Sequence, residues 1–176
     1  TTTTKIIYPQ FNKIKNVKVI VNPEFLRESL AIQDLLKPHL IVIGENKSGD
    51  GLELRKYYEN FYKKCPEILF TDLVTAEMIK YSNNAFLATK ISFINSIANI
   101  CQNIPNTDVK TIAYAIGKDP RIGPQFLNAG PGFGGSCLPK DLSALINFSK
   151  KIHNESLILK SVKAINDDQP KKIINL

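Results

Sequence analysis

One helical pattern, longer than any other in this 176-residue chain, most limits how the chain can fold. It starts at Thr75, a residue type that favours the N-cap position, has Glu77 in its first turn and reaches about Asn103. Its apolar positions recur mainly at intervals of three, four or seven: Ile79, Phe86, Ile94, Ile97, Cys101 and Ile104. A helix of about 28 residues extends about 42 Å. A chain this small must pack such a helix against a large body, and a second subunit is the partner we expect.

Three shorter helices are predicted on the C-terminal side of the long one. The first follows Asn106 or Thr107 as its N-cap and ends at Gly117, a residue type suited to the C′ position. The others run from about Pro139 to about His153 and from Leu157 to the end of the chain. A loop rich in glycine and proline lies between the first and the second of these helices.

The first seventy residues have an α/β pattern. Short runs rich in Val and Ile predict buried strands at Val17–Val21, His39–Ile43 and Ile68–Phe70. A helix is predicted over Ser48–Lys64, and Glu24–Lys37 is a loop or short helix. Because two or three strands cannot make a stable sheet alone, we expect this part to be the trailing end of a larger sheet, with a cut edge at the start of the chain.

The charge balance is basic, with 23 Lys and Arg against 16 Asp and Glu and a net charge of +7. Such a balance favours anionic partners, such as a phosphorylated small molecule, a membrane surface or a nucleic acid. The lysines are spread along the chain in blocks of two at most, whereas a nucleic-acid binder needs a clustered footprint. No run approaches the roughly 20 apolar residues of a membrane-spanning helix. We therefore expect neither a nucleic acid nor a membrane as a partner.

The three cysteines, Cys65, Cys101 and Cys137, are far apart and form no C-x-x-C pair. They predict neither a disulfide framework nor a zinc site, and with two histidines in the chain we expect no metal. No signal peptide is recognisable at the start. These features predict a reducing, cytoplasmic location, in which Cys65 and Cys101 pack as small apolar residues.

Gly130–Gly135 matches G-x-G-x-x-G, but it follows a helix and a loop, whereas the dinucleotide-binding fingerprint follows a strand and opens a βαβ unit. These glycines instead allow the backbone to pass close to a ligand. Cys137 comes directly after them, just before the helix predicted at Pro139, and Lys140 adds a positive charge. A helix N-terminus and a nearby cation both favour the thiolate, so Cys137 is predicted to be a nucleophile.

Two further polar groups fall where a ligand could bind. Lys80 and Asn84 are four residues apart and share one face of the long helix. Glu24 and Glu28 follow the end of a predicted strand, where ligand sites of open α/β sheets lie. For both groups, an exposed polar face explains the spacing equally well.

Three separated segments carry a resemblance: Asn22–Glu28, Lys80–Ala98 and Ile116–Asp141. In order and type they are similar to motifs of the UDP-glucose/GDP-mannose dehydrogenase family, and the resemblance covers about Val17–Pro170. Arg121–Cys137 resembles the UDP-glucose branch more than the GDP-mannose branch.

The resemblance implies an NAD-dependent enzyme with an NAD-binding Rossmann-like domain, a central helical dimerisation domain and a C-terminal nucleotide-binding domain. Residues 1–72 would be the C-terminal part of the first domain, and residues 73–176 the central domain. The expected fold class is α+β and mostly α: a few strands from the end of a Rossmann-like sheet, then a helical domain with one long central helix. The usual Gly-rich phosphate loop is missing, so we expect a fragment that is inactive alone and forms a homodimer through its central helices.

The implied reaction is the oxidation of a nucleotide sugar's primary alcohol to a carboxylate with two NAD, UDP-glucose to UDP-glucuronate being the expected case, for polysaccharide biosynthesis. Cys137 would attack the intermediate aldehyde, giving a thiohemiacetal and then a thioester that water hydrolyses. Lys80 would stabilise developing oxyanions, and Asn84 would bond the same oxygen or fix a water. Asp141 would orient Lys80 or accept a proton, and Glu24 would be the base for the hydrolytic water.

The resemblance also implies binding residues. Substrate contacts are expected from Phe25, Leu26, Arg27, Glu28, Arg121, Phe126, Leu127, Gly130, Phe133, Gly134 and Lys140. Among them, Arg121 would reach the substrate of a second subunit, and the glycine-rich loop would wrap the sugar and nucleotide. Contacts with NAD are expected from Glu28, Cys137 and Lys140.

Three alternatives stay open. GDP-mannose or a UDP-N-acetylhexosamine could be the substrate, because the residues that select the base lie largely outside this chain. The chain could be a catalytically inactive dimerisation fragment, which would dimerise without binding NAD. A basic helical nucleic-acid binder would show salt-dependent retention on DNA.

Overall fold

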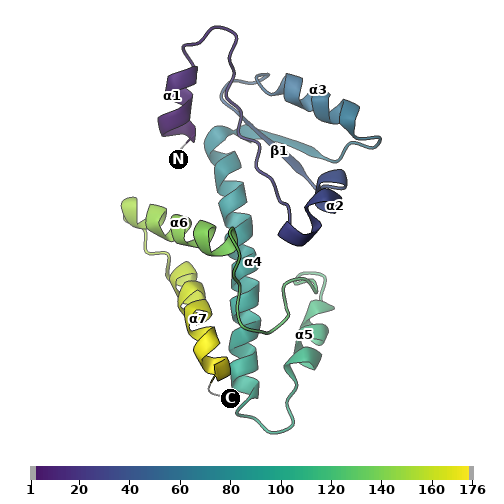
Figure 1. The fold of residues 1–176 in the computed structure, drawn as a ribbon, viewed down its shortest axis with the longest axis vertical. Helices are drawn as coiled ribbons and strands as arrows, with labels where there is room; N and C mark the ends of the chain where they lie inside the picture. Colours follow the sequence, from purple (N-terminus) through teal and green to yellow (C-terminus); the bar gives the residue numbers. More distant parts are fainter. Residues whose placement is uncertain (1–2, 175–176) are drawn as a thin grey trace. The chain divides into compact units, whose positions relative to one another are not determined.

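The computed structural model describes residues 3–174, and the chain divides into two compact units, Thr1–Lys80 and Tyr81–Leu176 (Figure 1). The first unit contains short helices and a two-stranded sheet, and the second consists of helices and connecting loops. In order, the elements are η1 (Thr3–Ile7), α1 (Tyr8–Phe11), η2 (Glu28–Leu30), α2 (Ala31–Leu36), β1 (Ile41–Glu45), α3 (Leu52–Phe61), β2 (Ile68–Asp72), α4 (Leu73–Cys101), α5 (Val109–Gly117), α6 (Leu138–Lys151) and α7 (Leu157–Ile174). The predicted fold class, α+β and mostly α with one long helix, is confirmed.

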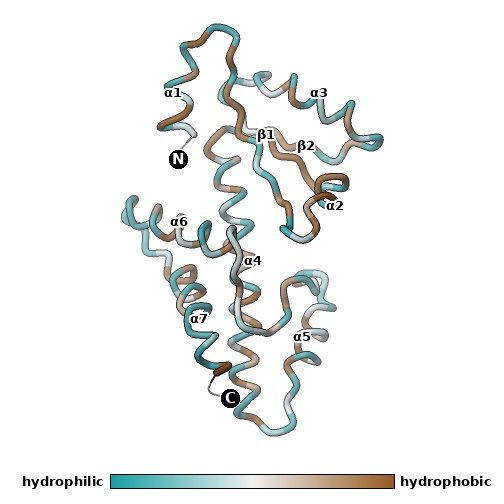
Figure 2. The backbone as a smooth tube through the Cα atoms, in the orientation of Figure 1, coloured by the Kyte–Doolittle hydropathy of each residue, from teal (hydrophilic) through white to brown (hydrophobic). Residues whose placement is uncertain are grey.

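The sheet of the first unit pairs β1 with β2 in parallel, and α3 connects the two strands. Ile41–Ile43 are buried, as expected of a parallel strand covered on both faces, and Figure 2 shows hydrophobic residues on both strands. The strand predicted at Val17–Val21 is wrong: the structure has an isolated antiparallel bridge between Val21 and Gly44 in its place. A β-branched run becomes a strand only where a neighbouring strand offers a ladder along its length, and most of this run is exposed or half-buried.

The long helix begins two residues earlier than its predicted N-cap. The carboxylate of Asp72 accepts hydrogen bonds from the N–H groups of Val74 and Thr75 at 3.0 and 2.9 Å, and from the Thr75 hydroxyl at 2.6 Å. These bonds, that of the Thr75 side chain first, lower the pKa of Asp72. The last residue of β2 therefore caps α4, and the prediction of Thr75 as the N-cap is wrong.

Gly44 in β1 lies where a side chain has no room. A Cβ built on it would lie 2.5 Å from the Cβ of Ala76 in α4. We expect Gly44→Ala to lower the free energy of unfolding of the first unit by about 2 kcal/mol, which corresponds to roughly 8–16 °C in the thermal unfolding of a unit of this size.

Two variants separate this steric effect from the general cost of replacing glycine. Gly134→Ala is the matched control, because a Cβ there meets nothing within 4 Å. Adding Ala76→Gly to Gly44→Ala removes the opposing methyl group and should restore part of the lost stability. Equal unfolding temperatures for Gly44→Ala and Gly134→Ala would show that β1 and α4 move apart to admit the added methyl group without any loss of stability.

The helices of the second unit confirm the sequence pattern, with two corrections at their ends. The N-cap of α5 is Asp108, whose carboxylate accepts from the N–H groups of Lys110 and Thr111, and not Asn106 or Thr107. Gly117 is the last residue of α5 and not a left-handed C′ residue. A Cβ on Gly117 would lie 2.9 Å from the Cα of Pro124, so close packing of the following loop requires this glycine.

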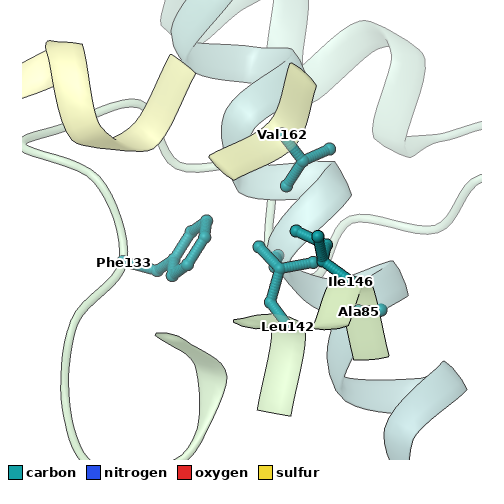
Figure 3. Packing of buried hydrophobic residues seen from close by; sticks show 6 residues of the cluster. Ala85, Phe133, Leu142, Ile146 and Val162 are labelled. Atoms are coloured by element: carbon teal, nitrogen blue, oxygen red, sulfur yellow. The ribbon is translucent and has the colours of Figure 1, made fainter. Parts of the chain in front are cut away.

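The core of the second unit joins three helices and the glycine-rich loop. Figure 3 shows side chains from α4, α6, α7 and the loop turned toward one another. The cluster consists of Ala85, Ala88, Phe133, Leu142, Ile146 and Val162. Because α6 starts immediately after the glycine-rich loop, this core fixes the position of the helix start at which the candidate nucleophile, Cys137, lies.

Candidate active site

The thiol of Cys137 is exposed at the N-cap position of α6. Pro139 follows in the first turn, where a missing N–H costs no hydrogen bond. Cys137 Sγ lies 3.5 Å from the hydroxyl oxygen of Ser136. The thiol therefore lies at a helix start, beside unpaired backbone N–H groups, and a ligand can reach it.

Asp141 lies one turn after Cys137 and is buried together with Asn84 of α4. Asn84 Nδ2 donates to Asp141 Oδ2 at 2.7 Å, and Lys140 Nζ lies 3.5 Å from Asp141 Oδ1. The N–H of Asp141 donates to the carbonyl oxygen of Cys137 at 2.9 Å. A carboxylate taken out of water needs such partners. The expected role of Asp141 in orienting Lys80 stays a prediction.

Glu24 and Lys80 form an ion pair in the first unit. Lys80 Nζ donates to Glu24 Oε1 at 2.7 Å and to the Glu24 carbonyl oxygen at 2.6 Å, and the N–H of Leu26 donates to Glu24 Oε2 at 2.6 Å. Lys80 also lies over the ring of Phe25, 5.9 Å from its centroid. The Glu24 side chain is 52% exposed and that of Lys80 19%, so the carboxylate is the member of the pair that solvent reaches.

Arg27, an expected substrate contact, binds Asp34. Its backbone N–H and Nε donate to Asp34 Oδ2 at 2.8 and 3.0 Å, and its Nη2 donates to Oδ1 at 2.6 Å. The hydrogen bonds from Arg27 lower the pKa of Asp34 to about 2, and the same pair raises the pKa of Arg27. Leu26 and Glu28 are exposed on either side of Arg27, so the segment presents three side chains to solvent.

The loop after α5 holds three expected substrate contacts. Arg121 donates from Nε and Nη2 to the carboxylate of Asp119, which lowers the pKa of Asp119, while 87% of the arginine side chain stays exposed. Phe126 has a φ of 63°, a conformation that is costly for a bulky residue. Leu127 is buried and lines, with Lys118 and other residues, a cavity of about 590 Å³.

The glycine-rich loop is fixed by amide side chains that the sequence pattern did not indicate. They lie on α4 and α7 and bond to the loop backbone: Asn95, Asn166 and Gln169. The ring of Phe133 is buried in the core, so its expected contact with a substrate stays a prediction. A Cβ built on Gly130 or Gly134 would meet nothing within 4 Å, which leaves room for another molecule near these two residues. For Asn95, the sequence signal that could have indicated this role is an amide on the largely apolar helix α4, whereas α7 carries many charged residues and gives no such signal.

Cys65 and Cys101 are partly buried. Within residues 3–174, no group of three or more His, Cys, Asp and Glu side chains is placed to hold a metal ion. The helices of this described range include none that is long and apolar enough to cross a membrane.

A glycine-containing turn connects β1 to α3 in the first unit, and turns of this type between a strand and a helix bind the pyrophosphate of a dinucleotide in Rossmann folds. Its N–H groups are occupied: Gly49 and Gly51 donate to the carboxylate of Glu45, Gly51 at 2.9 Å. A Cβ on Gly51 would lie 2.5 Å from Ile43 Cγ2, so packing of this chain explains that glycine. The Glu45 carboxylate already occupies the N–H groups of this turn, so the turn does not fit the phosphates of NAD.

Two family models match the chain. The model of the UDP-glucose/GDP-mannose dehydrogenase family, central domain, matches residues 74–168. The model of the NAD binding domain of the same family matches residues 1–62, which confirms NAD as the cofactor at the level of the family.

Known proteins agree with these models. UDP-glucose 6-dehydrogenase of Rickettsia bellii is 50% identical over 157 residues, which are 89% of this chain and 36% of that protein. The chain thus spans about a third of the length of the curated relatives that it matches. A UDP-glucose dehydrogenase structure from Pyrobaculum islandicum has a TM-score of 0.83 at 38% identity, covering 88% of this chain and 35% of that chain. A GDP-mannose dehydrogenase structure from Pseudomonas aeruginosa has a TM-score of 0.62 at 33% identity, covering 96% and 39%. The chain therefore belongs to the UDP-glucose/GDP-mannose dehydrogenase family.

Proposed function

We propose that the protein to which this chain belongs is an NAD-dependent UDP-glucose 6-dehydrogenase. The overall reaction converts UDP-glucose, two NAD and one water into UDP-glucuronate, two NADH and three protons. The observation that carries the proposal is the exposed Cys137 at the start of α6, one turn before the buried Asp141–Asn84 pair. The names of the most similar relatives support UDP-glucose as the substrate.

Cys137 is the proposed nucleophile. Its thiolate adds to the aldehyde carbon of the half-oxidised sugar and forms a thiohemiacetal, whose oxidation product is a thioester. Water then hydrolyses the thioester, which releases the acid and returns the thiol. Asn84 is proposed to bond the sugar oxygen or a water, while Asp141 fixes the amide through its 2.7 Å bond or accepts a proton.

Glu24 and Lys80 are proposed to act as a base and an oxyanion partner. Glu24 is exposed and takes a proton from the hydrolytic water, and Lys80 places a positive charge where oxygen becomes negative. Their ion pair, with Lys80 Nζ 2.7 Å from Glu24 Oε1, holds the two side chains next to each other. Around them, Phe25, Leu26, Arg27 and Glu28 are the proposed contacts with the substrate, and Glu28 is also proposed to contact NAD.

The loop before α6 is proposed to surround the sugar and nucleotide. Gly130 and Gly134 have open space where a Cβ would be, which allows a ligand to approach the backbone. Lys140 is exposed beside the start of α6 and is proposed, with Cys137, to contact both substrate and NAD. The conformation of this loop is proposed to depend on three side chains that lie within it or next to it: Phe126, Leu127 and Phe133.

We also propose a homodimer through α4, a cytoplasmic location and a role in polysaccharide biosynthesis. The face of α4 that carries Phe86, Phe93 and Ile100 is exposed in this chain, and exposed apolar patches mark interaction surfaces.

The test is the reaction of the full-length protein with NAD and UDP-glucose, followed by NADH absorbance. We expect two NADH for each UDP-glucose consumed, and no turnover by residues 1–176 alone. GDP-mannose and a UDP-N-acetylhexosamine are compared in parallel, since the Pseudomonas relative's likeness makes GDP-mannose the second candidate. Turnover of GDP-mannose without UDP-glucose, or one NADH per sugar, would contradict the proposal. Absence of any NAD binding by the full-length protein would favour an inactive dimerisation module.

A further inference from the structure

The backbone of Gly130 is held on both sides by buried amide side chains. Its N–H donates to Asn95 Oδ1 at 2.8 Å, and its carbonyl oxygen accepts from Gln169 Nε2 at 3.1 Å. Asn95 and Gln169 are 1% and 4% exposed. Asn99 Nδ2 donates to Gln169 Oε1 at 3.1 Å, which sets the direction in which the Gln169 amide faces. The bonds of Asn95 and Gln169 thus join α4 and α7 to the loop, and the bond of Asn99 joins the two helices to each other.

Phe133 is held in the same way by one side chain. Its N–H donates to Asn166 Oδ1 at 2.7 Å, and its carbonyl oxygen accepts from Asn166 Nδ2 at 3.0 Å. Between the two held residues, Gly132 has a φ of 102°, and a Cβ on it would lie 2.6 Å from Asn166 Oδ1. Gly132 thus allows both the turn and the close approach of this amide.

We propose that Asn95, Asn166 and Gln169 form an amide clamp that positions the glycine-rich loop, and through it Cys137, for the reaction proposed above. The clamp fixes four backbone groups within the four residues 130–133, and the loop is exposed from Gly134 through Cys137. The start of the loop is therefore ordered before any ligand arrives, and its last residues can contact the sugar. In the loop, the three amides bond to backbone groups, so they are positioning residues.

The clamp predicts a cost in catalysis that exceeds the cost in binding. A misplacement of the order of 1 Å can reduce a reaction rate about 100-fold, whereas the residues that select the nucleotide's base lie largely outside this chain. For Asn166→Ala in the full-length protein, we expect kcat for UDP-glucose to fall roughly tenfold or more while KM changes less than about threefold. Asn166→Asp keeps the acceptor for the N–H of Phe133 and should recover part of kcat. Asn147→Ala, at an exposed asparagine of α6, is the control and should match the wild type.

Amide hydrogen exchange tests the clamp without any activity. In the wild type, the N–H groups of Gly130 and Phe133 should exchange slowly. Asn166→Ala should speed exchange at Phe133 at least about tenfold and leave Gly130 slow, and Asn95→Ala should do the reverse.

The outcomes separate the clamp from the reaction on which it rests. Unchanged exchange at Phe133 in Asn166→Ala overturns the clamp, even in an active enzyme. Faster exchange with unchanged kcat overturns the positioning role. A wild type that exchanges as expected but does not oxidise UDP-glucose contradicts the proposed function and leaves the clamp supported. If Asn166→Ala does not fold, Asn166→Asp decides: a kcat equal to that of the wild type counts against the clamp.

Discussion

Replacing Cys137 by serine in the full-length protein is expected to lower the rate of UDP-glucuronate formation by roughly 1,000-fold or more. A serine hydroxyl stays almost fully protonated near neutral pH, so it adds slowly to an aldehyde. A helix start cannot ionise an alcohol to a useful extent. The second oxidation should therefore be affected more strongly than the first.

The other two cysteines provide the matched controls. Cys65 and Cys101 are partly buried, whereas Cys137 is exposed, so Cys65→Ser and Cys101→Ser should keep activity within about twofold of the wild type when folded. The measurement is NADH formed per unit time and per UDP-glucose, with circular dichroism to confirm the fold of each variant. Undiminished acid formation by Cys137→Ser would end the proposed covalent mechanism.

The local features of this fold could be read from the sequence because they depend on neighbours along the chain. The three- and four-residue spacing of apolar residues predicted α4, and its true start differs by two residues because Asp72, at the end of a strand, caps it. The strand predicted at Val17–Val21 is wrong for the opposite reason, since a strand depends on a ladder partner that is distant in the sequence.

The candidate site follows the same division. The position of Cys137 before a helix follows from Pro139, two residues later, and the structure has Cys137 at the N-cap. The bond between Asn84 and Asp141 joins residues 57 apart, and that between Phe133 and Asn166 joins residues 33 apart. Neither spacing along the chain indicates a pair, so the sequence supplied candidate residues without their partners.

The exposed face of α4 leads to the second large effect. Phe86, Phe93 and Ile100 are spaced by seven residues and are 65%, 50% and 55% exposed, the pattern of a seam between paired helices. Lys90, between the two phenylalanines, donates to the carbonyl oxygens of Ile122 and Gly123 at 3.0 and 3.3 Å. That contact holds the loop of Arg121 against the same helix, so a subunit packed on this face would be within reach of this loop.

Changing both Phe86 and Phe93 to aspartate is expected to raise the dissociation constant of the homodimer by roughly 1,000-fold or more. Burying one phenylalanine side chain contributes about 1.5–3 kcal/mol, a two-fold interface counts each residue twice, and 1.4 kcal/mol is about tenfold in affinity. Both side chains are exposed in the single chain, so its fold should survive.

Ile158→Asp on α7, 71% exposed, is the control and should remain dimeric by analytical ultracentrifugation. If Arg121 serves the second subunit's substrate, the double variant should also lose activity in proportion to the monomer fraction. A monomeric wild type, or a double variant that stays dimeric, would place the dimer contact elsewhere or remove it from the proposal.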